Sequence, residues 1–401
     1  MKGKEAYNLG TFFTLYIAQS IPMSFFSTVL PVMMRQESFS LSAIGLLQLI
    51  KLPWIFKFLW APWVDRNCSS VRDYKRWIFS SELIYAGIIC YLSFLDFKID
   101  FNLIFVFLIL SFIASATQDI ATDALAVVSF SKKDKSLVNS MQSMGSFGGS
   151  LIGSGLLLVL FHQLGWDSIL FCLSLFVVLA LVPLLFNRHL TMEEPAVTVK
   201  ASPADLFYFF RQKKIWRQIG FLFLAYSGLI GTLAMLKPYM VDLGYDMKEI
   251  GFMNGIVGTF IGFLASFAAG FIVRKRGRYF SRILFAGLVV LAALYFVCLP
   301  SMQPTTVLLY VGIALLWGSY GMSTIVVYTT AMDCVRPGRE GTDFTVQTVI
   351  THLSSMCVAI LSGKIADAIH YQGLFYVELS LAILAFFYIL FVFKKPKEAE
   401  Q

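Results

Sequence analysis

The chain has 401 residues, of which 58% are hydrophobic and 14% are charged, and its formal net charge is +8 at pH 7. A mean hydropathy of +0.73 and 39 phenylalanines exclude an ordinary soluble protein and predict a polytopic membrane protein embedded in a lipid bilayer. The six cysteines form no Cys-x-x-Cys pair and the four histidines lie in different segments, so neither a metal site nor a cofactor is expected.

Twelve apolar runs follow one another along the chain, each long enough to cross a bilayer, since a spanning helix needs about 20 apolar residues. The predicted spans are 8–34, 41–64, 77–97, 102–130, 137–161, 167–187, 215–240, 247–272, 282–299, 306–331, 343–369 and 374–393. They predict an all-α protein with an N-terminal six-helix bundle (1–187), a charged linker (188–214) and a C-terminal six-helix bundle with a short tail (215–401).

The basic residues indicate how these spans are oriented. Most Lys and Arg lie in the termini, the linker and every second loop, whereas the opposite loops hold only Arg35, Lys98 and Lys248. Because basic loops stay on the cytoplasmic side, both termini and the linker are predicted to be cytoplasmic. This asymmetry explains the positive net charge without a nucleic-acid partner.

The two halves resemble copies of one another. Segment 30–45 aligns with segment 236–251, and in each pair an Ile-Gly dipeptide occupies the same place. Ser40 and Asp246 stand where an N-cap would start the second helix of each half. Two related six-helix halves around a linker are typical of transporters built from repeats.

This organisation resembles the major facilitator superfamily. The stretch "LLQLIKLPWIFKFLWAPWVDR" (46–66) together with "SATQDIATDALAV" (115–127) is similar to the AmpG-type permeases, a group of muropeptide importers and related siderophore importers. The resemblance implies a symporter of the bacterial inner membrane that works by alternating access and takes up a small molecule with protons. The chain is expected to be a monomer. Asp65 and Arg66 match the family's cytoplasmic loop motif, which implies a role in a cytoplasmic gate.

Asp119 and Asp123 are the most prominent polar residues inside a predicted span. They are four residues apart and therefore project from one face of a helix, which in the superfamily borders the central cavity. A carboxylate there can take up a proton on one side of the membrane and release it on the other. The structural alternative is a neutralising ion pair, for which Lys57 is the expected partner, and a pair that changes partners during transport would satisfy both interpretations.

Other polar residues within the spans are weaker candidates. Lys51 is a candidate for binding an anionic substrate, with an ion pair as the alternative, and Lys364 with Asp367 suggests a periplasmic gate or a local ion pair. The remaining substrate-binding candidates, most of which also suit helix packing, are Gln19, Gln118, Gln142, Tyr226, Tyr320 and Gln347.

Glycines recur every fourth residue in two of the spans. Gly145, Gly149 and Gly153 do so in the fifth span, and Gly251–Gly255 and Gly258–Gly262 in the eighth, so both helices are predicted to pack closely against a neighbour. In the superfamily these two helices meet at the interface between the halves.

The cargo is the least determined part of the prediction. Few cations and many aromatic residues, including Trp54, Trp60 and Trp317, favour a compact siderophore-like solute over a muropeptide. An integral membrane enzyme is a weaker alternative, because the sequence has no Gly-x-Ser-x-Gly or His-Glu-x-x-His motif. A non-transporting signalling protein also stays open.

Overall fold

The computed structural model describes residues 3–40, 44, 47–193, 200–302 and 304–393, and these residues form helices and connecting loops without a strand. Contacts divide the chain into two compact units. The first comprises Met1–Tyr208 and Val335–Val346, and the second comprises Phe209–Cys334 and Gln347–Gln401. A short segment from late in the sequence therefore belongs to the first unit. The six-plus-six division at the linker stays a prediction.

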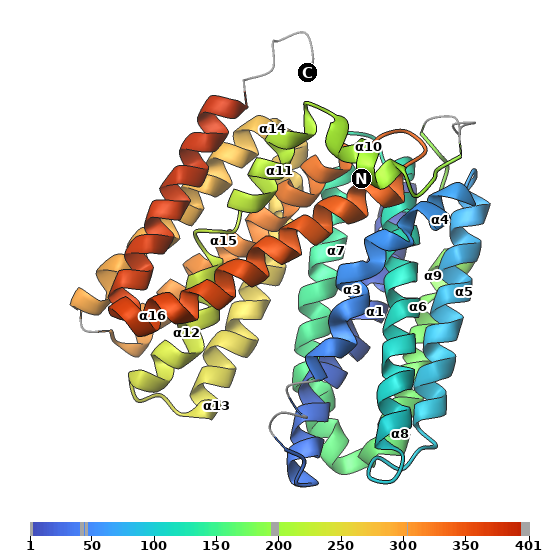
Figure 1. The fold of residues 1–401 in the computed structure, drawn as a ribbon, viewed down its shortest axis with the longest axis horizontal. Coiled ribbons are helices and arrows are strands. Elements are labelled where there is room, and N and C mark those ends of the chain that lie inside the picture. The colour runs from blue at the N-terminus through green and yellow to red at the C-terminus, as the bar shows by residue number, and fades with distance from the viewer. Residues whose placement is uncertain (1–2, 41–43, 45–46, 194–199, 303, 394–401) are drawn as a thin grey trace. The chain divides into compact units, whose positions relative to one another are not determined.

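The first unit is built around two long antiparallel helices, α5 and α6, which lie side by side (Figure 1). Its apolar core includes Phe25, Phe26 and Phe112, all fully buried. The helices are α1 (Gly3–Gln36), η1 (Leu47–Lys51), α3 (Leu52–Phe56), η2 (Lys57–Leu59), α4 (Ala61–Arg66), α5 (Val71–Leu92), α6 (Phe101–Ser129), α7 (Lys135–Ser150), η3 (Leu151–Leu156), α8 (Leu157–Ala180) and α9 (Val182–Phe186), with α10 (Asp205–Arg211) inside the predicted linker.

The predicted second span is a series of short helical pieces. Pro53 and Pro62 stand at the first positions of α3 and α4, where a proline starts a helix but interrupts the hydrogen bonds of a preceding one. The 3-10 helices η1 and η2 precede α3 and α4. This segmentation sets the direction of Lys57, which lies in η2 and is buried despite its charge.

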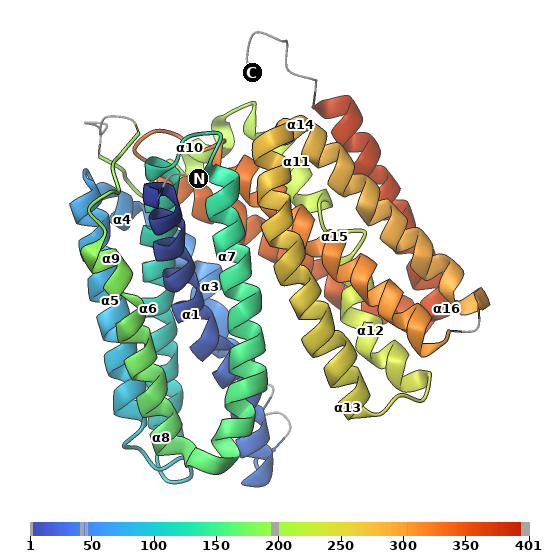
Figure 2. The ribbon, with the colours of Figure 1, turned by 180° about the vertical axis from the view of Figure 1, so that it is seen from behind.

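Helices α1 and α7 approach each other closely through the predicted glycines (Figure 2). A Cβ atom at Gly145 would lie 2.6 Å from Tyr16 Cβ, and one at Gly149 would overlap Ser20 Cβ. The expected close packing of the fifth span is therefore present, and its partner is α1, in the same unit. The expectation for Gly251 and Gly255 is wrong, because both have open space around them.

A side chain at Gly149 is expected to separate α1 from α7. Replacing Gly149 with Ala should lower the free energy of unfolding by about 1–3 kcal/mol, because the added methyl group would overpack this contact. Gly155→Ala is the matched control, since nothing lies within 4 Å of its Cβ position. Thermal unfolding of both purified variants measures the difference, and equal midpoints would contradict the proposed contact.

The second unit contains a helix that is interrupted within the predicted seventh span. α11 (Ile215–Leu224) ends before five non-helical residues, and α12 (Ile230–Asp242) starts after them. The other helices are α13 (Met247–Ile250), η4 (Gly251–Gly258), α14 (Thr259–Cys298), η5 (Leu299–Met302), α15 (Thr306–Met332) and α16 (Glu340–Val392), the last of which begins within the first unit. Asp246 caps α13 as predicted, accepting a hydrogen bond from Glu249 N at 2.7 Å.

Seven helical stretches of the described residues are long and apolar enough to cross a membrane. The number is smaller than twelve partly because α14 and α16 each continue through a bend, at Gly277 and His370 respectively. The helices within the second and seventh predicted spans are interrupted, and each piece is too short to cross a membrane alone. Helix α5 is long enough but carries several charges. The all-helical class is confirmed, and the count of twelve spans stays a prediction.

Candidate functional site

Helix α6 places two carboxyl groups inside the first unit. Asp119 and Asp123 lie one turn apart and expose only 2% and 1% of their surface. Both face the helices α1 and α7 and the segmented stretch that contains Lys57. Ionised groups at such positions need partners, because an unpaired buried charge is very unfavourable.

Asp119 has a cationic partner. Its Oδ2 accepts a hydrogen bond from Lys57 Nζ and forms an ion pair with it, and its Oδ1 accepts one from Gln19 Nε2 at 2.9 Å. The Lys57 ammonium also lies 4.9 Å from the centre of the Trp54 ring, a position that favours a cation. Lys57 and Asp119 thus form a buried pair with their charges balanced.

Among the described residues, Asp123 has only neutral hydrogen-bond partners. Its Oδ1 accepts hydrogen bonds from Tyr16 OH at 2.7 Å and from Gln142 Nε2 at 3.1 Å, whereas its Oδ2 is buried without a hydrogen bond. Asp119 lies one helical turn earlier on the same helix, so the two carboxyl groups are neighbours. Since one Lys57 can balance only one of two neighbouring carboxylates, the arrangement is suited to holding a proton at Asp123.

Two further candidates of the first unit lie outside this network. Lys51 is half-buried at the end of η1 and has no hydrogen bond or ion pair among the described residues. Gln118 is fully buried on α6, and neither atom of its amide group has a hydrogen-bond partner there. Lys51 is therefore a cation available to an anionic ligand, while Gln118 does not orient the carboxylates.

Three candidates belong to the second unit. Tyr226 lies in the interruption between α11 and α12, where its hydroxyl donates to Thr324 Oγ1 at 3.1 Å and its ring centre is 5.4 Å from that of Tyr320. Gln347 donates from Nε2 to the Ala331 carbonyl at 3.0 Å. The two tyrosines form an aromatic pair beside a helix break, and Gln347 links α16 to α15.

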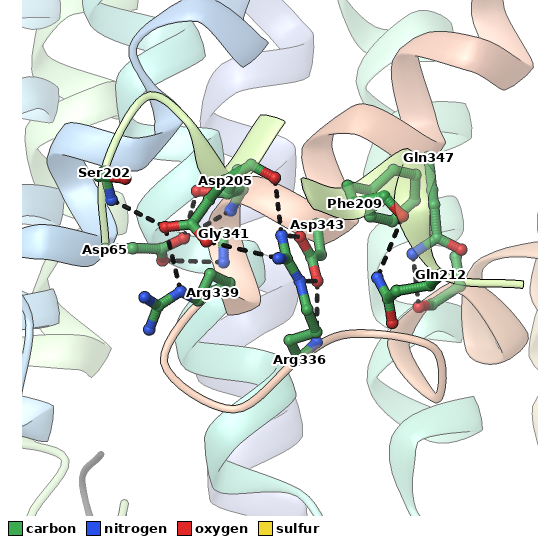
Figure 3. Close-up of polar contacts among 12 residues, drawn as sticks. Asp65, Ser202, Asp205, Phe209, Gln212, Arg336, Arg339, Gly341, Asp343 and Gln347 are labelled. Atoms are coloured by element: carbon green, nitrogen blue, oxygen red, sulfur yellow. Dashed lines mark hydrogen bonds and ion pairs between the residues drawn. The ribbon is translucent and has the colours of Figure 1, made fainter. Parts of the chain in front are cut away.

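Asp65 holds the start of α16 within the first unit (Figure 3). Its Oδ1 accepts from Gly341 N at 2.9 Å, and its Oδ2 accepts from Thr342 N at 2.7 Å and Thr342 Oγ1 at 2.6 Å. A carboxylate is favourable there because the first N–H groups of a helix lack partners within it. Burial raises the pKa of Asp65 to about 7, although the hydrogen bonds from Thr342 and Gly341 act in the opposite direction.

Two arginines extend this cluster of the first unit. Arg336 binds Asp343 with two nitrogens, at 2.8 and 2.6 Å, and reaches Asp205 Oδ1 at 3.4 Å. Arg339 Nε lies 3.2 Å from Asp205 Oδ2. The neighbouring motif residue Arg66 is exposed and contributes none of these contacts. The sequence motif therefore identified Asp65 as a contact residue but not the arginines that complete the cluster.

The expected ion pair between Lys364 and Asp367 is not formed. Both side chains are exposed on α16, and no salt bridge joins them. Exposed pairs of this kind gain little free energy, since water already solvates both charges. The pairing prediction is wrong in this structure, and a gating role for either residue stays a prediction.

Besides Asp205 and Asp343, sequence reasoning missed the buried carboxyl groups of Glu82 and Glu378. Glu82 of α5 is fully buried, and Glu378 of α16 is 1% exposed and accepts a hydrogen bond from Gly231 N at 3.1 Å, at the start of α12. Each is a single glutamate within an apolar stretch, which is itself an indication of a functional or capping role in a membrane helix.

Comparisons with known proteins agree with this organisation. The Major Facilitator Superfamily profile matches residues 12–356. The Escherichia coli K12 anhydromuropeptide permease is 24% identical over 258 residues, which cover 62% of this chain and 52% of that protein. The Rickettsia felis putative transporter AmpG 4 is 20% identical over 405 residues, covering 97% of each chain.

A solved structure supports the fold independently. The Escherichia coli fucose:proton symporter aligns over 97% of this chain and 98% of that chain with a TM-score of 0.74 and 12% sequence identity. Together with the profile match over most of the sequence and the apolar helices, this identifies a multi-pass membrane transporter. The chain belongs to the Major Facilitator Superfamily and, within it, resembles the AmpG-type permeases.

Proposed function

We propose that the chain imports anhydromuropeptides, or cell-wall fragments of the same chemistry, across the bacterial inner membrane together with protons. The relatives named as anhydromuropeptide permease and AmpG transporter support this cargo. The sequence-based preference for a siderophore-like solute receives no specific support from the named relatives. The muropeptide, weighed as the alternative from sequence, therefore takes precedence.

Lys51 is the observation in the structure that favours this cargo. Its ammonium group is half-buried and unpaired among the described residues, and the peptide part of a muropeptide carries carboxylates. A charge-assisted hydrogen bond between them would anchor the solute and is stronger than one between neutral groups. Lys51 lies on the same segmented stretch as Lys57, so bound solute and the buried carboxyl pair would share one structural element.

Asp123 is proposed as the proton carrier and Asp119 as its charge-balanced neighbour. Lys57 forms a buried ion pair with Asp119, so a second negative charge at Asp123 would be left without a counter-ion of its own. Movement of Lys57 away from Asp119 would change the charge balance and so couple proton release to a conformational change. This exchange of partners is how we relate the pair to alternating access.

The remaining parts of the proposal concern topology and gating. We place both termini on the cytoplasmic side, as the distribution of basic residues indicates, and assign twelve spans and a monomer. The Asp65 contact with the start of α16 is proposed to close the cytoplasmic side, because it must break before that segment can leave the first unit.

Binding of the cargo can be tested by thermal stabilisation of the purified protein. A ligand at one hundred times its dissociation constant adds about 2.7 kcal/mol to the free energy of unfolding, so an anhydromuropeptide should raise the melting temperature clearly. Lys51→Gln should weaken this ligand about tenfold or more, because a hydrogen bond to a charged group contributes about 1.5–3 kcal/mol.

Lys133→Gln is the matched control, since Lys133 is an exposed cation in a loop, and it should bind the ligand normally. A panel of ferric chelates serves as the competing ligand class. Stabilisation by a chelate and none by the anhydromuropeptide would overturn the proposed cargo and restore the siderophore-like solute.

A further inference from the structure

Glu82 is a buried carboxyl group outside the site described above. It lies in the middle of α5, is 0% exposed, and neither of its oxygens has a hydrogen-bond partner among the described residues. Aspartate and glutamate side chains are rarely fully buried, and those that are buried normally have an ion-pair or hydrogen-bond partner. The position therefore needs an explanation other than solvation or pairing.

The neighbouring face of α6 carries polar groups that are also unsatisfied. Helices α5 and α6 are antiparallel, and the Tyr85 hydroxyl lies beside Ser115. Glu82 lies about one turn before Tyr85 on α5, and Gln118 lies about one turn after Ser115 on α6. Because the two helices are antiparallel, Glu82 and Gln118 lie at the same level. Gln118 is fully buried, and neither its amide nitrogen nor its amide oxygen has a partner among the described residues. No hydrogen bond joins Gln118 to Glu82, so the Glu82 carboxyl group has no donor there that would stabilise its charge.

Among the described residues, no salt bridge or hydrogen bond joins a cation to Glu82. The carboxylates Asp119 and Asp123 on α6 interact with α1, η2 and α7, and the nearby cation Lys57 is paired with Asp119. Helix α8 contacts α5 through Ser174, which donates to the Ala86 carbonyl at 2.8 Å, and one turn further it buries the apolar Val177 in the same core. Tyr85 is the titratable neighbour on α5 itself.

These surroundings favour the neutral form of the carboxyl group. An ionised carboxylate loses its hydration on burial and here would gain neither a counter-charge nor a full set of donors. A protonated carboxyl group carries no charge, so burial at this position costs it less than it costs the ionised form.

We propose that Glu82 is a second proton-binding site of the first unit, located between α5 and α6, where its carboxyl group is held in the protonated form. The site is separate from Asp123, which is on another face of α6. The inference adds to the proposed proton coupling, and it concerns proton binding that is measurable without substrate or a gradient.

Infrared spectroscopy of the reconstituted full-length protein tests the proposal directly. A protonated carboxyl group has a C=O stretching band that an ionised one lacks. At about pH 7, where an exposed glutamate with an ordinary pKa near 4.3 is ionised, the spectrum should contain a carboxyl band that is lost in Glu82→Gln. In Glu82→Asp the band should be displaced rather than lost, which keeps the test informative if the Gln variant does not fold.

Two further variants and a salt test serve as controls for the infrared measurement. Asp367→Asn removes an exposed carboxylate of α16 and should leave the carboxyl bands unchanged. Asp123→Asn should remove a different band, so failure at Glu82 and failure of the proposed coupling at Asp123 are distinguishable. Unchanged carboxyl bands in Glu82→Gln would overturn the proposal. A melting temperature that rises with NaCl but not KCl, only when Glu82 is intact, would overturn it in favour of a sodium site.

Discussion

Replacing Asp123 with Asn is expected to abolish solute accumulation driven by a proton gradient. The amide keeps a hydrogen-bond acceptor for Tyr16 OH, which Oδ1 holds at 2.7 Å in the structure, but it cannot carry a proton. Each proton that moves through 100 mV contributes about 2.3 kcal/mol, equivalent to about fiftyfold accumulation of solute. Uptake of labelled anhydromuropeptide into proteoliposomes with an imposed gradient should therefore fall to simple equilibration.

The same variant is expected to exchange solute between the two sides at equal pH, because exchange does not require net proton movement. Retained exchange with lost accumulation distinguishes a coupling residue from one needed for folding. Asp123→Glu, which keeps a titratable group, should recover part of the accumulation. Normal accumulation by Asp123→Asn would show that the proton is carried elsewhere.

Lys57→Met is expected to destabilise the protein by about 3–5 kcal/mol. The substitution leaves the Asp119 carboxylate buried without its counter-ion, and breaking one side of a buried pair has this cost. A second substitution, Asp119→Asn, should restore most of the stability, since it removes the uncompensated charge. Denaturant unfolding of the two single variants and the double variant, treated as a double-mutant cycle, measures the coupling between the two groups.

An exposed pair provides the control. Arg76 and Asp73 lie 3.6 Å apart with 71% and 22% of their side chains exposed, and Arg76→Gln should change stability by less than about 1 kcal/mol. Equal effects of Lys57→Met and Arg76→Gln would show that Lys57 is not a structural counter-ion. Restored stability without restored transport would assign Lys57 a role in the cycle as well.

The helical class and the carboxyl pair could be predicted because both depend on local sequence. Apolar runs of sufficient length indicate membrane helices, and the four-residue spacing of Asp119 and Asp123 fixes their common face on any α-helix. The partner Lys57 could be named as a cation in a neighbouring span, and the structure contains that ion pair. Its other neighbour, Gln19, comes from α1, and sequence alone suggested only a cavity position for it.

The parts that could not be predicted depend on tertiary contacts. The segmentation of residues 47–66 follows from two prolines whose effect on an apolar run depends on what packs around them. In the sequence, Glu82 is an isolated charged residue in an apolar run. That it lacks a hydrogen-bond partner among the described residues becomes apparent only from the packing of α6 and α8 against α5. The arginines 336 and 339 lie in a loop whose contact with Asp205 joins residues far apart in the chain.

The contact between Asp65 and Thr342 has a consequence for biosynthesis. These residues are separated by 277 positions, and domains generally fold as units in the order of synthesis. The first unit is therefore incomplete after its helices up to residue 208 have been inserted. Asp65 lacks its N–H donors until residues 341 and 342 have been synthesised. A ribosome-bound chain that ends before this point should be more sensitive to proteolysis than one that extends past residue 346.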